Sequence, residues 1–596
     1  METAKKLELL REKMRQSGVD CYYVNTADYH QSEYVPDAFR TRAWLTGFSG
    51  SQGSALVTQN AALLWADGRY FIQAAKQIAG SEFVLMKMAV EGVPTIEEWL
   101  VENLAEGSCF GFNGDVVSEQ SYRSFSELLS NKNVSIRTDL SLVEDIWEDR
   151  PELPHSPLFI HGVEYTGLDA REKIAKVREY LAEKCVDAAF YARLDDVCWL
   201  TNLRSDDIPS NPVSLSFLLV TTETTKIFLD RRKLTDDILN YLAAVDIEAL
   251  PYEAVYDYIF GIDELGVSSL VVDPLILSRN LYSAIPASVK ITHEMDFPRL
   301  YKACLNETEQ RCLKEVYVDD AVALTKFIYW VKQNVASGEL DELNTEAKLH
   351  SLRAESKYFI EDSFATISAY GPNGAMMHYS ANPESFSRLE PRGFYLIDSG
   401  GQYHKGTTDI TRTISLGGLT EQERLDYTLT LKGHIALARA KFLKGITGDY
   451  LDMLARQPLW QHHSDYKCGT GHAVGYLLGV HEGPQRISRH PSTIALKPGM
   501  LVTNEPGVYR EGEYGIRLEN NLIVYEDRKV GDDTFYAFET ISFIPFDREA
   551  IVVEELTREE LAWLNDYQQQ VYETVAKHLT AEEAEWLAAE TARLGD

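Results

Sequence analysis

In the last third of the chain, short apolar runs alternate with turn residues, and several of these runs end in an acidic residue. Residues 394–397 are Phe-Tyr-Leu-Ile, followed by Asp398 and then Ser-Gly-Gly, which predicts a buried strand and a turn. Residues 407–414 are again β-prone and contain Asp409. A strand, a glycine-rich connection and a second strand predict a hairpin that brings Asp398 and Asp409 together. Two carboxylates so close repel each other unless they are protonated or bridged by cations.

A second pair of acidic residues follows the same arrangement. Residues 501–503 predict a strand, and Glu505 stands just beyond it in Asn-Glu-Pro-Gly, although Pro-Gly by itself marks only a turn. Glu519 lies between the β-prone stretches 516–518 and 522–525. The short interval between the two glutamates predicts another hairpin, so both carboxylates can reach one pocket.

Apolar residues at helical spacing occur at the two ends of the chain and in the segment that precedes these strands. Residues 1–8 open an amphipathic helix, and residues 307–335 have the apolar periodicity of a long helix. The acidic last forty residues carry Leu, Trp and Tyr at helical spacing. We therefore predict packed helices at the C-terminus and not a disordered tail.

The first three hundred residues contain one pattern twice. A charged helical segment precedes Val-Asp-Cys-Tyr-Tyr at 19–23 and Val-Asp-Ala-Ala-Phe at 186–190, and Trp-Leu-Thr follows each of them. Two copies of one α/β domain explain the repeat. A proline-rich stretch at 151–157 separates the copies, and the second junction falls near 298–306. The predicted domains are residues 1–154, 155–303 and 304–596.

Three histidines stand among glycines in the same region as the acidic residues. His472 lies in Cys-Gly-Thr-Gly-His-Ala-Val-Gly, His378 ends Gly-Pro-Asn-Gly-Ala-Met-Met-His, and His481 begins His-Glu-Gly-Pro. A histidine in such a context is more often a loop or core residue than a ligand. However, glycines let the backbone approach a site closely, and four carboxylates with one imidazole form an oxygen-rich set that can neutralise two divalent cations.

These motifs, in their order, resemble the pita-bread metallopeptidases, the group that holds methionine aminopeptidase, prolidase and aminopeptidase P. Leu-Thr-Gly-Phe-Ser-Gly-Ser at 45–51, Trp-Ala-Asp-Gly-Arg-Tyr-Phe at 65–71 and the segment 556–565 resemble the long, three-domain aminopeptidases P in particular. The resemblance implies an α/β and α+β protein, in which two related creatinase-type α/β domains precede a pita-bread catalytic domain with a C-terminal helical extension.

The resemblance also implies the chemistry of the site. Asp398 would bind one metal, His472 and Glu505 the other, and Asp409 and Glu519 would bridge the pair. A metal-bridged hydroxide would attack the scissile carbonyl, with Glu505 as proton carrier. His378 and His481 would hydrogen-bond the developing tetrahedral intermediate, and Arg517 would orient a ligand carboxylate from behind. An oxygen-rich set of this kind favours Mn²⁺.

The implied reaction is removal of the first residue from peptides with proline at the second position, by a homodimeric enzyme. Prolidase, which cleaves Xaa-Pro dipeptides with the same metal set, is the nearest alternative. A catalytically silent pita-bread binding module is a second alternative, and creatinase, which lacks this metal set, is a third.

The composition of the chain indicates which kinds of partner it can bind and in which cellular compartment it is expected. The chain has 596 residues, with 58 Lys and Arg against 91 Asp and Glu, a net charge of −33. This charge argues against nucleic acid and anionic membrane surfaces as partners. No apolar run approaches the length of a bilayer span, and the N-terminus lacks the apolar core of a signal peptide. Seven dispersed cysteines without a Cys-x-x-Cys motif indicate reduced thiols and a cytoplasmic protein.

Cys468 is the point at which the chain departs from the family that it resembles. Aminopeptidase P and prolidase usually place a second histidine four residues before the ligand histidine, near the proline of the substrate. Cys468 can be a tolerated variant that packs as a small apolar side chain, or it can reshape the pocket beside the scissile bond. We favour the first interpretation.

Overall fold

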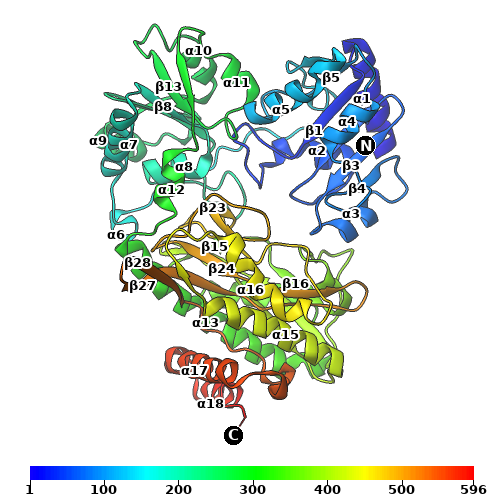
Figure 1. The fold of residues 1–596 in the computed structure, drawn as a ribbon, viewed down its shortest axis with the longest axis vertical. Helices are drawn as coiled ribbons and strands as arrows, with labels where there is room; N and C mark the ends of the chain where they lie inside the picture. Colours follow the sequence, from blue (N-terminus) through cyan, green and yellow to red (C-terminus); the bar gives the residue numbers. More distant parts are fainter. Residues whose placement is uncertain (596) are drawn as a thin grey trace. The chain divides into compact units, whose positions relative to one another are not determined.

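Two six-stranded sheets of the same topology form the N-terminal half of the computed structural model, which describes residues 1–595 (Figure 1). The strand orders are β4-β3-β2-β1-β5-β6 and β12-β11-β10-β8-β13-β14. In each sheet three neighbouring strands run antiparallel and the outer strands join them in parallel pairs. The predicted duplication of one α/β domain is therefore confirmed.

The first sheet consists of β1 (Cys21–Asn25), β2 (Ser54–Thr58), β3 (Ala62–Ala66), β4 (Val84–Lys87), β5 (Cys109–Gly111) and β6 (Ser135–Arg137). The second consists of β8 (Ala188–Tyr191), β10 (Ser216–Thr221), β11 (Thr225–Leu229), β12 (Glu248–Pro251), β13 (Ser269–Val272) and β14 (Lys290–His293). Their helices are α1 (Thr3–Ser17), α2 (Thr41–Thr46), α3 (Phe71–Gln77), α4 (Ile96–Asn103), α5 (Glu119–Leu129), α7 (Ala170–Lys184), α8 (Leu194–Thr201), α9 (Asp236–Ala244), α10 (Val255–Phe260) and α11 (Arg279–Ser283). The short elements β7 (Phe159–Ile160), α6 (Val163–Thr166), β9 (Leu203–Arg204) and α12 (Phe297–Lys302) connect these parts.

Alternation along the strands explains why both faces of the first sheet are covered. Ala55 and Val57 of β2 belong to the core cluster that α1 contributes to, whereas Leu56 points into the cluster on the opposite face. Successive side chains of a strand point to opposite faces, so a fully apolar strand needs a layer on each side. Helix α1 supplies one layer, and α4 and α5 supply residues to the other.

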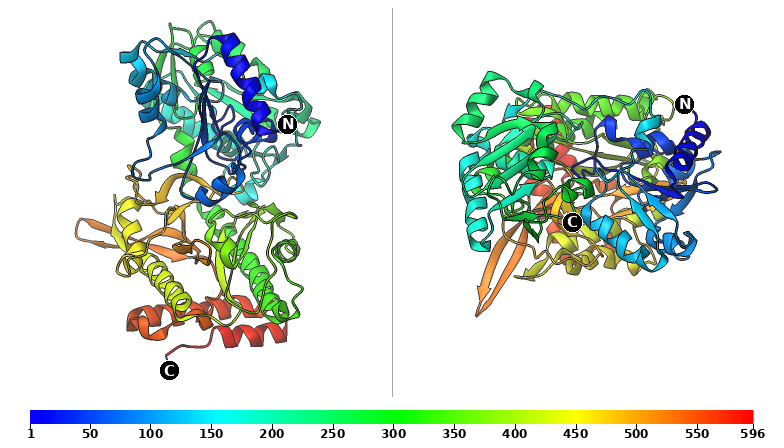
Figure 2. Two further views of the ribbon diagram at one scale, coloured as in Figure 1. Left: turned by 90° about the vertical axis from the view of Figure 1, so that its right-hand side faces the viewer. Right: turned by 90° about the horizontal axis from the view of Figure 1, so that it is seen from above.

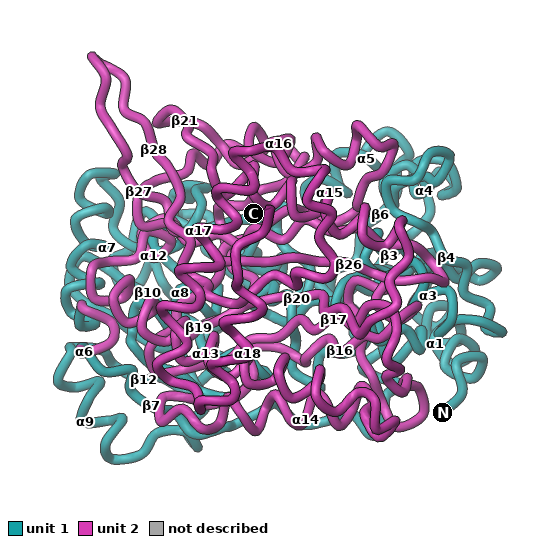
Figure 3. The backbone as a smooth tube through the Cα atoms, turned by 90° about the horizontal axis from the view of Figure 1, so that it is seen from below, with its two compact units in different colours: residues 1–163, 168–299 teal, residues 164–167, 300–596 magenta. Residues whose placement is uncertain are grey.

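The chain divides into two compact units, residues 1–163 with 168–299 and residues 164–167 with 300–596 (Figure 3). The first unit contains both six-stranded sheets and the short strands β7 and β9, and the second contains the strands from β15 onward and the helices from α13 onward. The boundaries that we drew at residues 154 and 303 stay predictions.

The second unit is a set of small curved sheets backed by long helices. Its helices are α13 (Glu307–Asn334), α14 (Glu342–Arg353), α15 (Glu421–Ala438), α16 (Gly448–Trp460), α17 (Arg558–Val575) and α18 (Ala581–Glu590). Its strands are β15 (Phe359–Asp362), β16 (Ile367–Tyr370), β17 (Phe394–Ser399), β18 (Gly401–Tyr403), β19 (Gly406–Thr407), β20 (Ile410–Ser415), β21 (Lys441–Leu443), β22 (Gly471–Ala473), β23 (Glu482–Ile487), β24 (Leu501–Asn504), β25 (Gly507–Arg510), β26 (Tyr514–Arg517), β27 (Asn520–Val530) and β28 (Asp533–Thr540). The β27–β28 hairpin extends away from the rest of the unit (Figure 2).

The connection between the two aspartate strands is more structured than the sequence predicted. Strand β17 pairs with β20 in an antiparallel register, as expected. However, the intervening residues form the β18–β19 hairpin, and β18 pairs with β15. The Gly-Gly at 400–401 is therefore not a simple turn, because the second glycine already belongs to the next strand.

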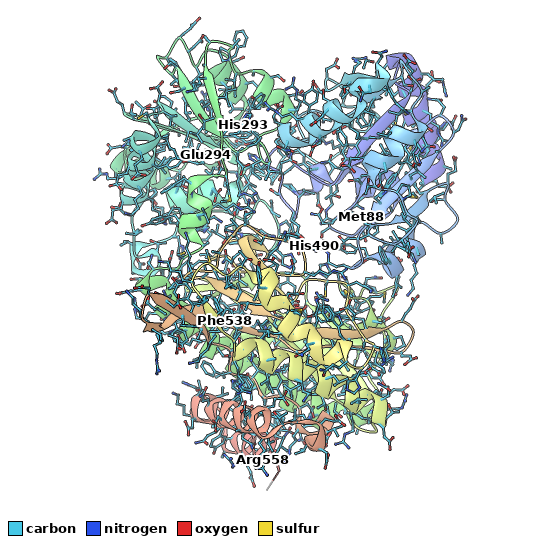
Figure 4. The ribbon with its side chains drawn as sticks, viewed as in Figure 1. Met88, His293, Glu294, His490, Phe538 and Arg558 are labelled. Carbon is cyan, nitrogen blue, oxygen red and sulfur yellow. The ribbon has the colours of Figure 1, made fainter. Side chains whose placement is uncertain are left out.

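The C-terminal residues form packed helices, as the apolar spacing predicted. Helix α17 begins beside Arg558 (labelled in Figure 4), after the N-cap Thr557, which forms a capping box with Glu560. Its buried side chains Leu564 and Val571 join the same core cluster as α13 and α15. Across residues 1–595, no helix combines the length and the apolar character that a membrane crossing requires.

Candidate functional site

Asp398 and Asp409 come from neighbouring antiparallel strands. Asp398 is the fifth residue of β17 and lies opposite Thr411 of β20, while Asp409 immediately precedes β20. Both side chains are buried. One carboxylate oxygen of Asp398, Oδ1, has no hydrogen-bond partner among the described residues. A buried carboxylate oxygen without a donor is a natural position for a cation.

His472 and Glu505 are brought together by a close approach of β22 to the end of β24. A Cβ atom on Gly471 would collide with the backbone carbonyl of Thr503, so only glycine allows this spacing. The Nε2 atom of His472 lies 3.4 Å from Glu505 Oε1 and 3.5 Å from Asp409 Oδ2. A hydrogen bond of 2.9 Å joins His472 Nδ1 to its neighbour's carbonyl at Ala473, which requires the proton on Nδ1 and turns Nε2 toward the carboxylates.

Glu519 completes the cluster from the link between β26 and β27. The hydroxyl of Thr411 donates to Glu519 Oε2 at 2.8 Å, whereas Oε1 is buried without a partner among the described residues. Ligand atoms of Asp409, His472 and Glu519 all lie within 4.8 Å of one another. Across residues 1–595 this is the one group of three or more such residues with that geometry.

The electrostatics of the cluster favour cations strongly. Burial first, and then the charges of Asp398 and Glu505, raise the pKa of Asp409 well above its ordinary value. Burial and then Asp409 do the same to the pKa of Glu519, and burial raises the pKa of Glu505 to about 7. Four carboxylates lie close together, and the hydrogen-bond donors around them offset only part of their negative charge. Two divalent cations would balance the charge that remains.

Arg517 is the cation that the protein itself provides. Its Nη2 donates to Asp398 Oδ2 at 2.5 Å, its Nη1 to the hydroxyl of Tyr509 at 2.8 Å, and its Nε to the hydroxyl of Thr411 at 3.1 Å. Arg517 fixes Asp398 through Oδ2 and leaves Oδ1 available to a cation. Arg517 therefore has the geometry of a side chain that orients a metal ligand.

The two further histidines lie in a row with His472. The ring of His481 is 4.4 Å from that of His472, centroid to centroid, and 6.2 Å from that of His378. All three side chains are partly exposed. This is a suitable position for groups that contact a substrate.

Cys468 lies at the edge of the cluster, in apolar surroundings. It packs against a group that contains Leu459, Tyr466 and Val508, together with Tyr509. Burial first, and then the charge of Glu505, raise the pKa of its thiol to about 11. The thiol is neutral at physiological pH and behaves as a small apolar side chain.

Glu342 is a buried carboxylate beside the His378 segment that the sequence did not single out. It is fully buried at the start of α14 and accepts hydrogen bonds from the segment that carries His378. The donors are the backbone amides of Tyr370 and Ser387 (both 2.7 Å), Asn373 Nδ2 (3.0 Å) and the hydroxyl of Tyr379 (2.8 Å). These bonds, with the N-terminus of α14, replace the hydration of the carboxylate and fix the segment.

Other supporting residues stand close to the ligands in the sequence. Thr411 and Arg412 follow Asp409, Asn504 precedes Glu505, and Asn520 follows Glu519. Their position near a ligand in the sequence is the only local sign of a supporting role. His434 on α15 also contacts this group, and nothing in the sequence around it indicates a role.

Comparison with family models assigns each part of the chain. The Creatinase/Prolidase N-terminal domain matches residues 6–143 and again residues 149–309. Metallopeptidase family M24 matches residues 311–526, and the C-terminal region of peptidase M24 matches residues 534–594. All five candidate ligands fall inside the M24 match.

Relatives of full length are similar over the whole chain. Aminopeptidase P2 of Arabidopsis thaliana is 36% identical over 94% of this chain and 84% of its own length. A probable Xaa-Pro aminopeptidase P of Tuber melanosporum is 36% identical over 99% of both chains. The crystal structure of an X-prolyl aminopeptidase from Caenorhabditis elegans, described as a cytosolic enzyme with a di-nuclear active site, matches with a TM-score of 0.96, 33% identity and complete coverage of both chains. A Xaa-Pro dipeptidase from Bacillus anthracis shares only the fold, at 21% identity over 64% of this chain and a TM-score of 0.52.

Proposed function

The chain belongs to metallopeptidase family M24, and we propose that it is an Xaa-Pro aminopeptidase, which releases the first residue of a peptide when proline stands second. One observation carries this proposal. The ligand atoms of Asp409, His472 and Glu519 converge within 4.8 Å, in a chain that aligns with Xaa-Pro aminopeptidases from end to end.

The donor set fits a pair of divalent metal ions. Asp398 and Glu519 each keep a buried oxygen without a hydrogen-bond partner among the described residues, and His472 presents Nε2 toward Asp409 and Glu505. Asp398 would hold one metal, and His472 with Glu505 would hold the other. Asp409 and Glu519 would contribute to both. Carboxylates with a single imidazole and no thiolate favour Mn²⁺ over a structural Zn²⁺ site.

The protein's own residues carry the proton and bind the developing charge. When bound, the metal pair supplies an acidified water as nucleophile and polarises the scissile carbonyl. Glu505, held by the hydroxyl of Thr503 at 3.2 Å, accepts a proton and passes it to the leaving nitrogen. His481 and His378 donate hydrogen bonds to the oxygen on which negative charge develops.

The proline requirement has a physical basis in the tertiary amide. Proline lacks the N–H that most peptidases bind, and its ring fixes the backbone, so a site that accepts it must recognise shape. The free amino terminus of the substrate is a cation and is attracted to the acidic cluster. Peptides with proline at the second position are therefore the proposed partners, and nucleic acid and membranes are not.

Prolidase is the alternative that this site alone does not separate from an aminopeptidase. Full-length similarity to Xaa-Pro aminopeptidases, with two N-terminal domains and a C-terminal extension, favours the aminopeptidase. A catalytically silent binding module is disfavoured because all five ligand positions carry ligand side chains. We further propose a cytoplasmic homodimer, in line with the description of the Caenorhabditis elegans enzyme as cytosolic.

A substrate panel tests the proposal. The Mn²⁺-loaded enzyme should cleave Xaa-Pro-Yaa, leave Xaa-Ala-Yaa largely intact, and cleave the dipeptide Xaa-Pro much more slowly. Preferential cleavage of the dipeptide would establish prolidase activity instead. Asp409→Asn serves as the inactive control for contaminating peptidases.

A further inference from the structure

Arg412 is a fully buried arginine just behind the ligand cluster. It lies on β20, three residues after Asp409, and is 1% exposed. All the hydrogen bonds that the structure describes for it go to neutral oxygens: the backbone carbonyls of Thr411, Glu519, Ile544 and Pro545, Oδ1 of Asn520 and the hydroxyl of Tyr567. A buried guanidinium without a carboxylate partner needs every one of these acceptors in place. It therefore ties their positions together.

Two of those acceptors belong directly to the ligand segment. Arg412 Nη1 donates to the backbone carbonyl of Glu519, and Nη2 donates to the side chain of Asn520 at 2.8 Å. The carboxylate of Glu519 needs a fixed backbone, because it reaches the cluster from the short link between two strands. Arg412 therefore holds this link through its backbone and through the side chain of Asn520.

A third acceptor comes from the C-terminal extension. The hydroxyl of Tyr567, on α17, accepts from Arg412 Nη2 at 3.0 Å and donates to the carbonyl of Ile544 at 2.8 Å. The ring of Tyr567 stacks on Trp563 of the same helix, with centroids 5.3 Å apart and an interplanar angle of 6°. Helix α17, red in Figure 1, packs against α13 and α15, so the hydroxyl is delivered to Arg412 by a fixed element.

His434 joins the same network from α15. Its Nδ1 donates to the carbonyl of Leu518 at 3.1 Å, and its Nε2 accepts from Asn520 Nδ2 at 3.2 Å. Burial, and then the charge of Arg412, lower the pKa of His434 to about 3, so the ring is neutral and can play both parts. Its own carbonyl accepts from Asn504, the residue before Glu505. The network thus contacts the residues beside both glutamate ligands.

We propose that the C-terminal extension is a working part of the metal site, in which Tyr567 is a positioning residue that fixes Glu519 through Arg412 and Asn520. The inference rests on the proposed function, because it takes Glu519 to be a metal ligand. In this role the extension helps the site to retain metal, in addition to stabilising the fold.

The test is Mn²⁺ affinity in Tyr567→Phe, which removes one hydroxyl and keeps the stacked ring. Tyr572→Phe is the matched control, since it makes the same change on the same helix at a residue that is 38% exposed. The metal-free full-length protein is titrated with Mn²⁺ in a calorimeter. The Mn²⁺ affinity of Tyr567→Phe should be about tenfold weaker than that of the parent, which is the lower end of the loss expected when a group that supports a metal ligand is removed. The turnover number at saturating Mn²⁺ should stay within about twofold of the parent. Backbone hydrogen exchange at residues 518–522 should be faster.

Arg412→Lys keeps the charge but offers a single nitrogen, so it should weaken Mn²⁺ binding further. Parental Mn²⁺ affinity in a folded Tyr567→Phe would overturn the inference. So would a loss of activity that saturating Mn²⁺ does not restore, because that is the signature of a purely structural role. If the parent itself binds no Mn²⁺, the proposed function fails and the inference fails with it.

Discussion

Chelation of the metal ions should make the stability of the protein depend on pH in one definite direction. Without cations, Asp409, Glu505 and Glu519 remain close together in a buried space. Their pKa values are raised in the folded state, by burial before any other cause. The folded protein therefore binds protons that the unfolded chain releases, and stability must fall as pH rises.

Glu505 gives a lower bound on the effect. Its pKa rises from 4.5 to about 7 on folding. Each pKa unit corresponds to 1.36 kcal/mol, so this residue alone changes the free energy of unfolding by about 3 kcal/mol. The contribution is fully present below pH 4.5 and is lost as pH approaches 7. Asp409 and Glu519 act in the same direction.

The assay is denaturant unfolding of the chelated protein between about pH 4 and pH 8, monitored by a probe in the catalytic unit. Glu505→Gln is the matched variant, because its amide has nearly the same shape and does not titrate. The parent should lose about 3 kcal/mol more than the variant across this range. Excess Mn²⁺ should restore the stability of the parent protein, and the gain should be largest at the highest pH. Equal pH dependence in both proteins, or a parent that gains stability with pH, would refute the reasoning.

Substitutions at four positions test the assigned roles. Asp409→Asn and Glu505→Gln should each lower kcat at least about a hundredfold in steady-state assays; near-parental turnover in folded variants would show that these assignments are wrong. Glu342→Gln should lower kcat/KM about tenfold by loosening the His378 segment while metal content stays parental; an effect no larger than that of the exposed control Glu339→Gln would exclude this role. Cys468→Ser should retain substantial Xaa-Pro cleavage, and Cys468→His should change KM more than metal content; complete loss in Cys468→Ser with both metals bound would make the thiol essential.

The elements that carry the ligands were predictable because their signals are local. The apolar run before Asp398 forms β17, and the run before Glu505 forms β24. The predicted pairing of the two aspartate strands exists, although another hairpin interrupts their connection, and a hairpin also lies between the two glutamates. The duplicated α/β domain was also visible, because each copy repeats the same order of helix, strand and turn residues. Local periodicity and turn chemistry are sufficient for these features.

The support behind the ligands was not predictable, because it joins residues that are far apart in the chain. Arg412 meets Tyr567 across 155 residues, and His434 meets Leu518 across 84. No local pattern marks such a partner, since each residue alone has the composition of an ordinary helix or strand. The same holds for Glu342, which the sequence presents as one more acidic residue near a helix start. Only the packing of helices against curved strands creates these contacts.

The central claim is that two metal ions held by the five ligands drive cleavage of the Xaa-Pro bond. The most direct measurement is Xaa-Pro-Yaa cleavage during titration of verified metal-free enzyme with Mn²⁺, with metal content determined on the same samples. We predict negligible cleavage without metal, full activity at two Mn²⁺ per chain, and weaker restoration by Mg²⁺. Full activity in a preparation shown to contain no metal would contradict the account.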